Sequence, residues 1–226
     1  MIINCMSNIN LPVSNNIDFI GDVAIISNIS HTHNKNLIKL FFKKFEYFKE
    51  VIFVPGSIDI LFDNDVMINN EYVHGHHHRK ILRNNVEKID DNELDIVILR
   101  DDLYEYEHED EIIKIYGQSY SEYKKYKYSN IHKNNGNSHL KSTEEIINMR
   151  KNIPKCDILI TTNSPFGDTN SCKYLLSKIL DIKPKYHIYN GLKNYIHTPI
   201  INYNNIAFIN SNIYNNNKKS YIIDLK

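Results

Sequence analysis

Residues 157–165 read DILITTNSP, a short apolar run that ends in small polar residues and turn formers. The first part, DILIT, has the length and the β-branched content of a buried strand. Further runs of the same character are IINCM (2–6), DVAIIS (22–27), VIFV (51–54), DIVIL (95–99), IIKIY (112–116), YHIY (186–189), IAFIN (206–210) and SYIIDL (220–225). Predicted strands are therefore spread over the whole chain.

Amphipathic stretches between these runs predict helices. LIKLFFKKFEYF (37–48) has apolar residues at helical spacing, and we expect one buried face made of Leu37, Phe41, Phe45 and Phe48. STEEIINMRK (142–151) opens with Ser142 and has Glu145 three positions later, which is a capping box. CKYLLSKIL (172–180) predicts a third helix. The alternation of strands and helices predicts an α/β layered domain.

The composition is that of one globular domain over residues 1–226. The chain is 42% hydrophobic and 24% charged, and its formal net charge is zero, so it can form a sizeable core. Because it has no overall excess of Lys and Arg, nucleic acid is not an expected partner. Polar stretches around 64–94 and 119–141 predict surface insertions, since their backbone needs water for its polar groups.

The start of the chain, MIINCMSNINLP, has neither a basic n-region nor a long apolar h-region. No stretch of the sequence is long and apolar enough to cross a bilayer. We therefore expect a soluble protein in the cytoplasm or elsewhere inside the cell, with no membrane partner. Cys5, Cys156 and Cys172 are odd in number and lack CxxC spacing, which predicts small core residues instead of disulfides or a thiolate zinc site.

Polar residues follow five of the predicted strands at the point where each strand ends. The segments are SNIN (7–10), SNIS (27–30), PGSID (55–59), TTNSP (161–165) and NGLK (190–193). In α/β domains ligands bind at the carboxyl ends of the strands. These five segments are therefore the predicted functional site.

The order and spacing of these segments resemble the calcineurin-like metallophosphoesterases, most closely the small subgroup of metallophosphoesterase-domain-containing, class III-like phosphodiesterases. That family carries Asp-x-His, Gly-Asp, Gly-Asn-His-Asp/Glu, a lone His and Gly-His-x-His on five loops. The corresponding segments here are CMSNIN, GDVAIISNIS, IFVPGSIDILFD, CDILITTNSPFGD and KPKYHIYNGLK. The resemblance covers essentially the whole chain and implies a four-layer α/β/β/α sandwich, in which helices flank two mixed β-sheets.

At the family's metal and catalytic positions this chain has different residues. Those positions are occupied by Asn8, Asn10, Asn28, Ser57, Ile58, Asp59, Thr162, Gly191 and Lys193. Asn8 and Asn28 replace two Asp ligands, the second of which bridges both metals in the family. Ser57 replaces a metal-binding Asn, and Ile58 replaces the His that assists the leaving group. Asn10, Thr162, Gly191 and Lys193 all stand where the family has His, while Asp59 survives with the scaffold residues.

These replacements remove the chemistry that the resemblance would imply. In that family two divalent ions generate a hydroxide nucleophile and clamp the phosphoryl oxygens. Neutral amides and hydroxyls are poor ligands for transition ions, and Lys193 adds a positive charge. We therefore expect no cofactor, and a catalytically degenerate metallophosphoesterase-fold protein that is kept for binding or for a structural role.

A first alternative is an active metal-dependent phosphodiesterase or phosphatase with a rebuilt site for two divalent ions, Mn, Fe or Zn. Its ligands would come from two polar runs. They are His74, His76, His77 and His78 in HGHHHRK (74–80), and Glu105, Glu107, His108 and Glu109 further on. Both runs lie between the motif segments, and adjacent histidines do not all converge on one ion. We expect the histidine tract to bind divalent ions only weakly and adventitiously.

A second alternative keeps a ligand without catalysis. The emptied pocket would offer hydrogen-bond donors and one cation to a nucleotide or phosphate. Its lining would be Asn8, Asn10, Asn28, Ser57, Thr162 and Lys193. The competing interpretation is that Lys193 fills the space of the lost ions and forms a salt bridge with Asp22 or Asp59. The other possible binding partner is a protein.

Two further segments have the composition of sites. HTH (31–33) carries alternate histidines, and SEYKKYKYSNIHKNN (121–135) interleaves basic and aromatic residues as single-stranded nucleic-acid binders do. We expect a polar loop before the first helix for HTH and a solvated insertion for the second segment, because Tyr and Lys are frequent throughout this chain.

Overall fold

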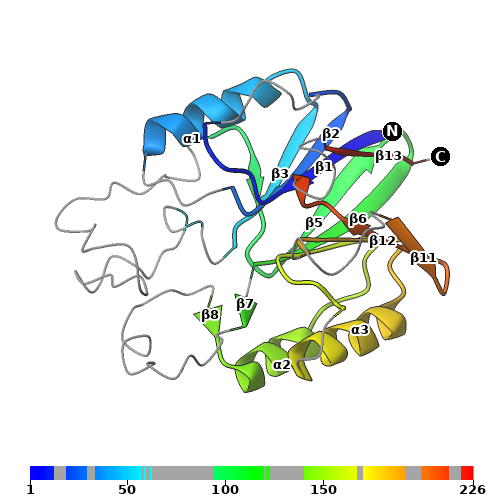
Figure 1. Ribbon diagram of the computed structural model, residues 1–226. Helices are drawn as coiled ribbons and strands as arrows, with labels where there is room; N and C mark the ends of the chain where they lie inside the picture. The colour runs from blue at the N-terminus through cyan, green and yellow to red at the C-terminus, as the bar shows by residue number, and fades with distance from the viewer. Residues whose placement is uncertain are drawn as a thin grey trace, which may run out of the picture.

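The computed structural model describes residues 1–12, 19–29, 34–56, 59, 62, 94–119, 121–122, 140–166, 170–191, 200–213 and 220–225. Over these residues the protein is mixed α/β, with two mixed β-sheets and three α-helices (Figure 1). Two short strands, β7 (Ser121–Glu122) and β8 (Leu140–Lys141), pair separately from the sheets. The predicted α/β class is therefore confirmed.

The first sheet has the strand order β13-β1-β2-β3-β4. Its strands are β1 (Ile2–Ser7), β2 (Val23–Ser27), β3 (Glu50–Val54), β4 (Val97–Ile98) and β13 (Tyr221–Asp224). The strands from β1 to β4 are parallel, and β13 is antiparallel to β1. The register aligns Ser7 with Ser27 and Ser27 with Val54, so β1, β2 and β3 end at the same edge.

The second sheet has the strand order β11-β12-β10-β9-β6-β5. Its strands are β5 (Asp102–His108), β6 (Glu111–Gln118), β9 (Ile158–Thr161), β10 (Tyr186–Tyr189), β11 (Ile200–Tyr203) and β12 (Ile206–Asn210). The inner strands β6, β9, β10 and β12 are parallel, and β5 and β11 are antiparallel edges. Gln118, Thr161, Tyr189 and Asn210 therefore lie in one row at the carboxyl ends.

Local sequence explains where the helices begin. In α1 (Lys35–Phe42) the Asn34 side chain accepts bonds from the first free backbone amides, and a 3₁₀ turn, η1 (Lys43–Phe45), continues it. Ser142 and Glu145 form the predicted capping box ahead of α2 (Thr143–Lys151). The third predicted helix is α3 (Asn170–Ile182).

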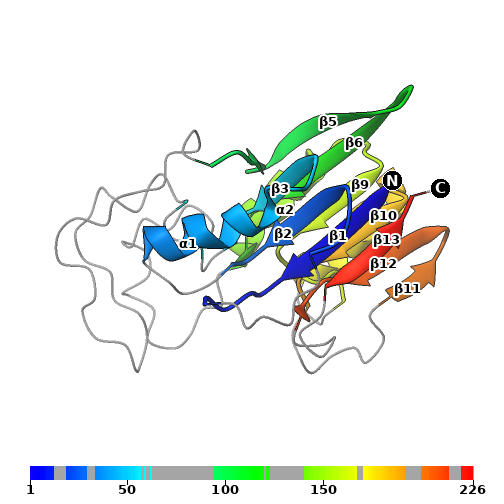
Figure 2. The same cartoon turned by 90° about the horizontal axis from the view of Figure 1, so that it is seen from above.

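Three clusters of buried apolar side chains hold these elements together. Ile38, Phe41, Phe42 and Phe45 of α1 and η1 pack against the outer face of the first sheet. Alternate residues of both sheets, such as Ile25 and Ile160, meet in a second cluster between them. Helix α3 packs Leu175 and Ile179 against the second sheet. Figure 1 shows α1 at the top, α2 and α3 at the bottom and the sheets between, and Figure 2 shows the strands running in similar directions.

Gly117 marks a close approach between the two sheets. A Cβ atom on it would lie 2.5 Å from Leu99 Cβ and 2.8 Å from Val54 Cγ2, so only glycine fits there. Leu99 follows β4 directly, and the chain passes from there into β5 of the other sheet. This crossing closes one side of the pair of sheets.

Strands β5 and β11 are absent from the prediction. In β5, Tyr106 is 8% exposed and packs between the sheets, while Glu105 and Glu107 alternate with it toward solvent. An edge strand with one solvent-exposed face has no continuous apolar run in its sequence, which is why this strand was not predicted. The predicted strand DIVIL is shorter than expected, because only Val97–Ile98 pairs with β3.

The first helix also differs from the prediction. Ile38 and Phe42 are buried, whereas Leu37 and Phe48 are only partly buried. The α-helix ends at Phe42 and the 3₁₀ turn has a shorter period, so the strict α-helical spacing does not continue to residue 48.

Most of the predicted insertions, residues 63–93 and 123–139, lie outside the described residues. Leu94 is 9% exposed and belongs to the cluster beneath α1.

Cys5 and Cys156 are buried thiols and Cys172 is half-buried, with burial raising the pKa of Cys156 to about 12. Within the described part of the chain, no helix has the length and apolar character needed to cross a membrane.

Candidate functional site at the strand ends

The carboxyl ends of the two sheets meet at one edge of the molecule. Ser7, the last residue of β1, forms a parallel bridge with Asn212, just beyond β12. The Ser7 amide donates to Ser211 O at 2.8 Å, and Ser7 Oγ donates to Asn190 Oδ1 at 3.4 Å. These bonds join the end of β1 to the ends of β12 and β10 in the other sheet.

Asn8 and Asn28, which the resemblance assigns to two ligand positions, both have left-handed backbone, with φ of 58° and 52°. Asn8 N donates to Ser27 O at 3.1 Å, and Ile9 N donates to Asn28 O at 3.0 Å. Among residues other than glycine, Asn tolerates this conformation best. Asn at both positions therefore meets a requirement of the backbone where β1 and β2 end.

The side chain of Asn28 lies against Gly56, which follows β3 closely. Asn28 is 5% exposed, and a Cβ atom at position 56 would lie 1.5 Å from Asn28 Oδ1. The amide thus occupies the space that any side chain at position 56 would need. Asn28 and Gly56 form one packed unit between the ends of β2 and β3.

Asp59 ties the same two loops together through its carboxylate. It is 4% exposed; Oδ1 accepts from Ile29 N at 2.8 Å and Oδ2 accepts from Gly56 N at 2.7 Å. A buried carboxylate is stable when both oxygens accept hydrogen bonds. Asp59 therefore holds the loop after β2 to the loop after β3.

A similar arrangement closes the end of the second sheet. Asn210 Oδ1 accepts from Gly191 N at 3.0 Å and from Asn212 N at 3.2 Å, and Asn212 Nδ2 donates to Gly191 O at 2.7 Å. A Cβ atom on Gly191 would lie 2.5 Å from Asn210 Nδ2. Gly191, predicted at a His position of the family, thus permits a close backbone approach to an asparagine that the prediction did not include.

The predicted site residues are only partly within the described chain. Thr162 is 5% exposed and its amide donates to Gln118 O at 3.4 Å, whereas Asn8 is half-buried and Asn10 is exposed. The predicted residues that lie outside the described ranges are Ser57, Ile58, Lys193, the tract with His74, His76, His77 and His78, and the HTH segment (31–33).

Beneath α2 lies a buried polar group that sequence reasoning missed. Arg150 is fully buried, and its Nε donates to Gln118 Oε1 at 3.3 Å. Gln118 Nε2 donates to Asp101 Oδ1 at 3.4 Å, and Tyr116 Oη donates to the same oxygen at 2.5 Å. Arg150 lies four residues after the buried Ile146, and this helical spacing is the sequence signal that marks it as facing inward.

His187 on β10 is the second buried group that sequence reasoning missed. It is fully buried, its Nε2 lies 3.0 Å from Thr161 Oγ1, and its ring stacks on Tyr189 with centroids 5.4 Å apart. Burial, and then the charge of Arg150, lower the pKa of His187 to about 3. The imidazole is therefore neutral at ordinary pH.

Among the described residues, the second polar run does not gather into a metal site. Glu105 and Glu107 point to the opposite face of β5 from His108, because side chains alternate along a strand. Lys114 pairs with Glu105 at 3.5 Å, and His108 Nε2 lies 3.9 Å from Glu109 Oε1 in the turn before β6. The side chains of this run therefore point in different directions. The run also lies at the amino end of β6, away from the strand-end loops.

Asp22 is likewise not a strand-end residue. It precedes β2, at the opposite end of that strand from Asn28. Its Oδ1 lies 3.0 Å from Lys49 Nζ and its Oδ2 accepts from Ile2 N at 2.8 Å. The carboxylate of Asp22 is thus paired with Lys49, and Lys193, its predicted partner, lies outside the described residues.

The strand-end residues that the structure describes do not fit the pair of divalent ions that the resemblance implies. The carboxylates described there, Asp59 and Asp101, accept hydrogen bonds from protein groups. The described residues contain no group of three or more His, Cys, Asp or Glu side chains arranged to hold an ion. Amide side chains at Asn8 and Asn28 are weak ligands for transition ions.

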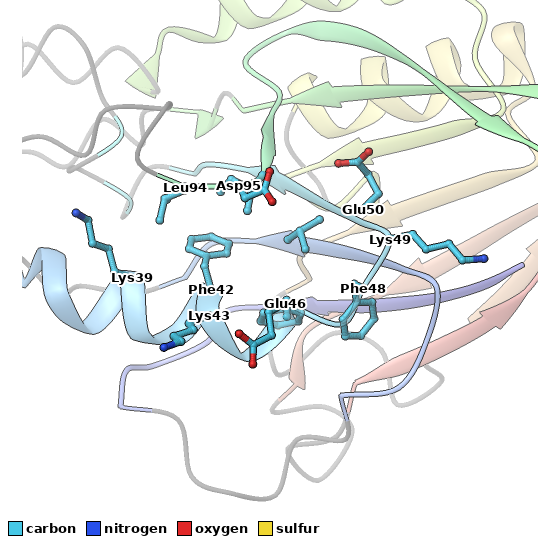
Figure 3. A pocket seen from close by; sticks show the side chains of 12 residues that line it. Lys39, Phe42, Lys43, Glu46, Phe48, Lys49, Glu50, Leu94 and Asp95 are labelled. Carbon is cyan, nitrogen blue, oxygen red and sulfur yellow. The ribbon is translucent and has the colours of Figure 1, made fainter.

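A groove of about 310 Å³ lies at the other end of the first sheet, between α1, η1 and the start of β3 (Figure 3). Phe42 and Val51 contribute to its floor, and charged side chains surround them. Two of those charges are already engaged, since Glu50 Oε2 accepts from Tyr104 Oη at 2.8 Å and Lys49 pairs with Asp22. The groove contains none of the predicted site residues.

Comparison with protein families, with curated proteins and with solved structures finds no match to this chain.

Proposed function

We propose that this chain is a metallophosphoesterase-like protein that has lost two-metal hydrolysis of phosphoric esters and acts through binding or as a structural partner. The three apolar clusters are compatible with the order helix, sheet, sheet, helix in that family's four-layer α/β/β/α sandwich. The described residues at family positions, from Asn8 to Gly191, belong to loops at one edge of the two sheets, as the resemblance requires.

The observation that carries the proposal is the bonding of Asp59. Its two oxygens satisfy the buried amides of Ile29 and Gly56. Turning this carboxylate toward an ion would leave those two amides without their acceptor, at a cost of about 1–3 kcal/mol each. The one acidic residue kept at the family positions is therefore committed to holding the loops together.

Neutral side chains do the same for the other loops. Asn210 and Asn212 bond the backbone of Gly191, and Asn28 fills the space beside Gly56. In the family the ions draw their ligand loops together. Here the hydrogen bonds of amide side chains hold the loops together, so the edge keeps its shape without the four positive charges of two divalent ions.

The metal content of the purified full chain tests the proposal. The protein is prepared without chelators or a metal-affinity step, beside a variant with His74, His76, His77 and His78 replaced by Ala. We expect less than one tightly bound Mn, Fe or Zn ion per chain in the variant, and any excess in the wild type then belongs to the histidine tract. Neither protein should hydrolyse an aryl phosphodiester with added Mn.

Two results would contradict the proposal. Two tightly bound ions per chain in the histidine variant would restore the two-metal site at the strand ends. Manganese-dependent hydrolysis that disappears in His76→Ala and His78→Ala would establish the rebuilt site instead. A rise in melting temperature with nucleotides or inorganic phosphate, without hydrolysis, would identify the binding role as that of a phosphate or nucleotide binder.

A further inference from the structure

We infer that Asn190 is a deamidation site that the folded strand ends hold closed. Asn190 and Gly191 follow β10 directly. Asn followed by Gly is the dipeptide most prone to this reaction, because glycine has no side chain to obstruct its own amide nitrogen. The same dipeptide occurs once more in the chain, at Asn135–Gly136.

The reaction needs only water. The Gly191 amide nitrogen loses its proton and attacks Asn190 Cγ, forming a new C–N bond while the side-chain nitrogen leaves as ammonia. Water then opens the cyclic imide at one of its two carbonyl carbons. The product is aspartate, or isoaspartate in which the main chain runs through the side-chain carbon.

In the folded protein the attacking nitrogen is already engaged. Gly191 is buried, and its N–H donates to Asn210 Oδ1 at 3.0 Å. Its carbonyl is also held, since Asn212 Nδ2 donates to Gly191 O at 2.7 Å. Attack requires the bond from the Gly191 amide to break, because the peptide group that joins Asn190 to Gly191 must turn toward the Asn190 side chain; the bond at Gly191 O restrains the residue that has to move.

The group to be attacked is held as well. Asn190 N donates to Thr161 O at 3.3 Å, and Asn190 Oδ1 accepts from Ser7 Oγ at 3.4 Å. These bonds fix the residue toward β9 on one side and toward β1 on the other. Deamidation therefore proceeds from the locally opened chain, at a rate reduced by the fraction of time that the strand ends are open.

The reaction would change the strand ends chemically. Aspartate at position 190 would place a negative charge beside Ser7, where the bonded side chains of Ser7, Asn210 and Asn212 are neutral. Isoaspartate would lengthen the main chain by one carbon between β10 and Gly191. Both products should loosen the bonds that join β1 to the second sheet.

Ageing of the full chain tests the inference. Wild-type protein is incubated at mildly alkaline pH, once folded and once in urea, and digested peptides are followed by mass spectrometry for conversion of amide to acid. In urea Asn190 and Asn135 should react at similar rates. In the folded protein Asn190 should react at least about tenfold more slowly than it does in urea, because the reaction there needs local opening of the strand ends.

Two variants identify the cause of the protection. Asn190→Gln should remove the signal, since glutamine forms the larger imide far more slowly. Asn210→Ala, shown by circular dichroism to be folded, should raise the rate at Asn190 by about tenfold and leave Asn135 unchanged. If that variant does not fold, the wild-type comparison decides by itself. Folded wild-type protein that reacts at Asn190 within twofold of the urea rate would overturn the inference.

Discussion

The carboxylate at the carboxyl ends of the parallel strands is buried, whereas the one at their amino ends is partly exposed to solvent. At the carboxyl ends Asp59 is 4% exposed and both of its oxygens accept from backbone amides. At the amino ends the Asp22 side chain is 31% exposed and pairs with Lys49, whose side chain is 64% exposed. A bond from Ile2 N, and then Lys49, lower the pKa of the Asp22 carboxyl.

The difference shows that burial, more than the type of residue, decides what a polar group does for stability. Removing one partner of a buried hydrogen bond costs about 1–3 kcal/mol, because the other partner loses water without compensation. An exposed ion pair contributes about 0–1 kcal/mol, since water and salt screen it. Single substitutions should therefore matter much more at the carboxyl ends than at the amino ends.

The largest effect is expected from acid acting on His187, whose pKa is lowered to about 3 from 6.5. Below pH 6.5 the unfolded chain takes up a proton that the folded chain refuses until about pH 3. Stability is therefore full above 6.5 and is lost as the pH falls through this window, by up to about 1.4 kcal/mol per pH unit. Urea unfolding at a series of pH values measures the slope.

His187→Gln should flatten this slope, because glutamine keeps a polar group beside Thr161 and does not titrate. His108→Gln, at the half-buried end of β5, is the control for the removal of one imidazole. Equal slopes in the wild type and in His187→Gln would show that the buried imidazole takes no part in the acid response.

Gly56→Ala should produce the next largest loss. The added Cβ would lie 1.5 Å from Asn28 Oδ1, and forced overpacking of this kind costs about 1–3 kcal/mol, occasionally more. The free energy of unfolding in urea measures it. In the double variant Asn28→Gly with Gly56→Ala the obstruction is gone, so most of the loss should be recovered; a double variant as unstable as Gly56→Ala alone would exclude this contact as the cause.

A matched pair of aspartates tests the comparison directly. Asp59→Ala should lower the free energy of unfolding by about 2 kcal/mol or more, because two buried amides lose their acceptor. Asp22→Ala should lower it by less than about 1 kcal/mol, because its partners are exposed. Added salt should reduce the effect of Asp22→Ala and leave that of Asp59→Ala nearly unchanged. Similar losses for both variants would remove the distinction between the two ends.

The smallest expected effect concerns the left-handed backbone at Asn8. Asn8→Ala should cost about 1 kcal/mol, because alanine has no ready access to a φ of 58°. Asn8→Gly should be nearly neutral, since glycine adopts this conformation without strain. Thermal unfolding of the two variants measures the difference, and the opposite order would mean that the amide itself, not the backbone, explains Asn at this position.

Much of the fold was predictable because it depends on local patterns. The apolar runs at 22–27, 51–54 and 157–161 became β2, β3 and β9, and the capping box at Ser142 formed as expected. Strand β5 was missed because its outward residues are acidic, and a half-wet edge strand carries no continuous apolar run. Arg150 was missed because its burial depends on partners that come from β6.

The candidate site was predictable in place but not in detail. The strand-end segments were identified correctly as neighbours in space, since parallel strands end at a common edge. The resemblance stated for the sequence assigned Asn8, Asn28 and Gly191 to positions of metal ligands. Their backbone angles and close contacts give each of them a structural reason, and Asn210 and Asn212 enter the site only through the end of β12.

By itself, the sequence determined the alternation of strands and helices and the polar character of the strand ends, because periodicity and residue type are local properties. The tertiary structure alone decided that Asp59 holds two loops, that Asp22 lies at the opposite end and that His187 and Arg150 are buried. Hydrogen-bond partners are set by residues far apart in the chain, and local spacing indicates only which face of a helix, such as that of Ile146 and Arg150, turns inward.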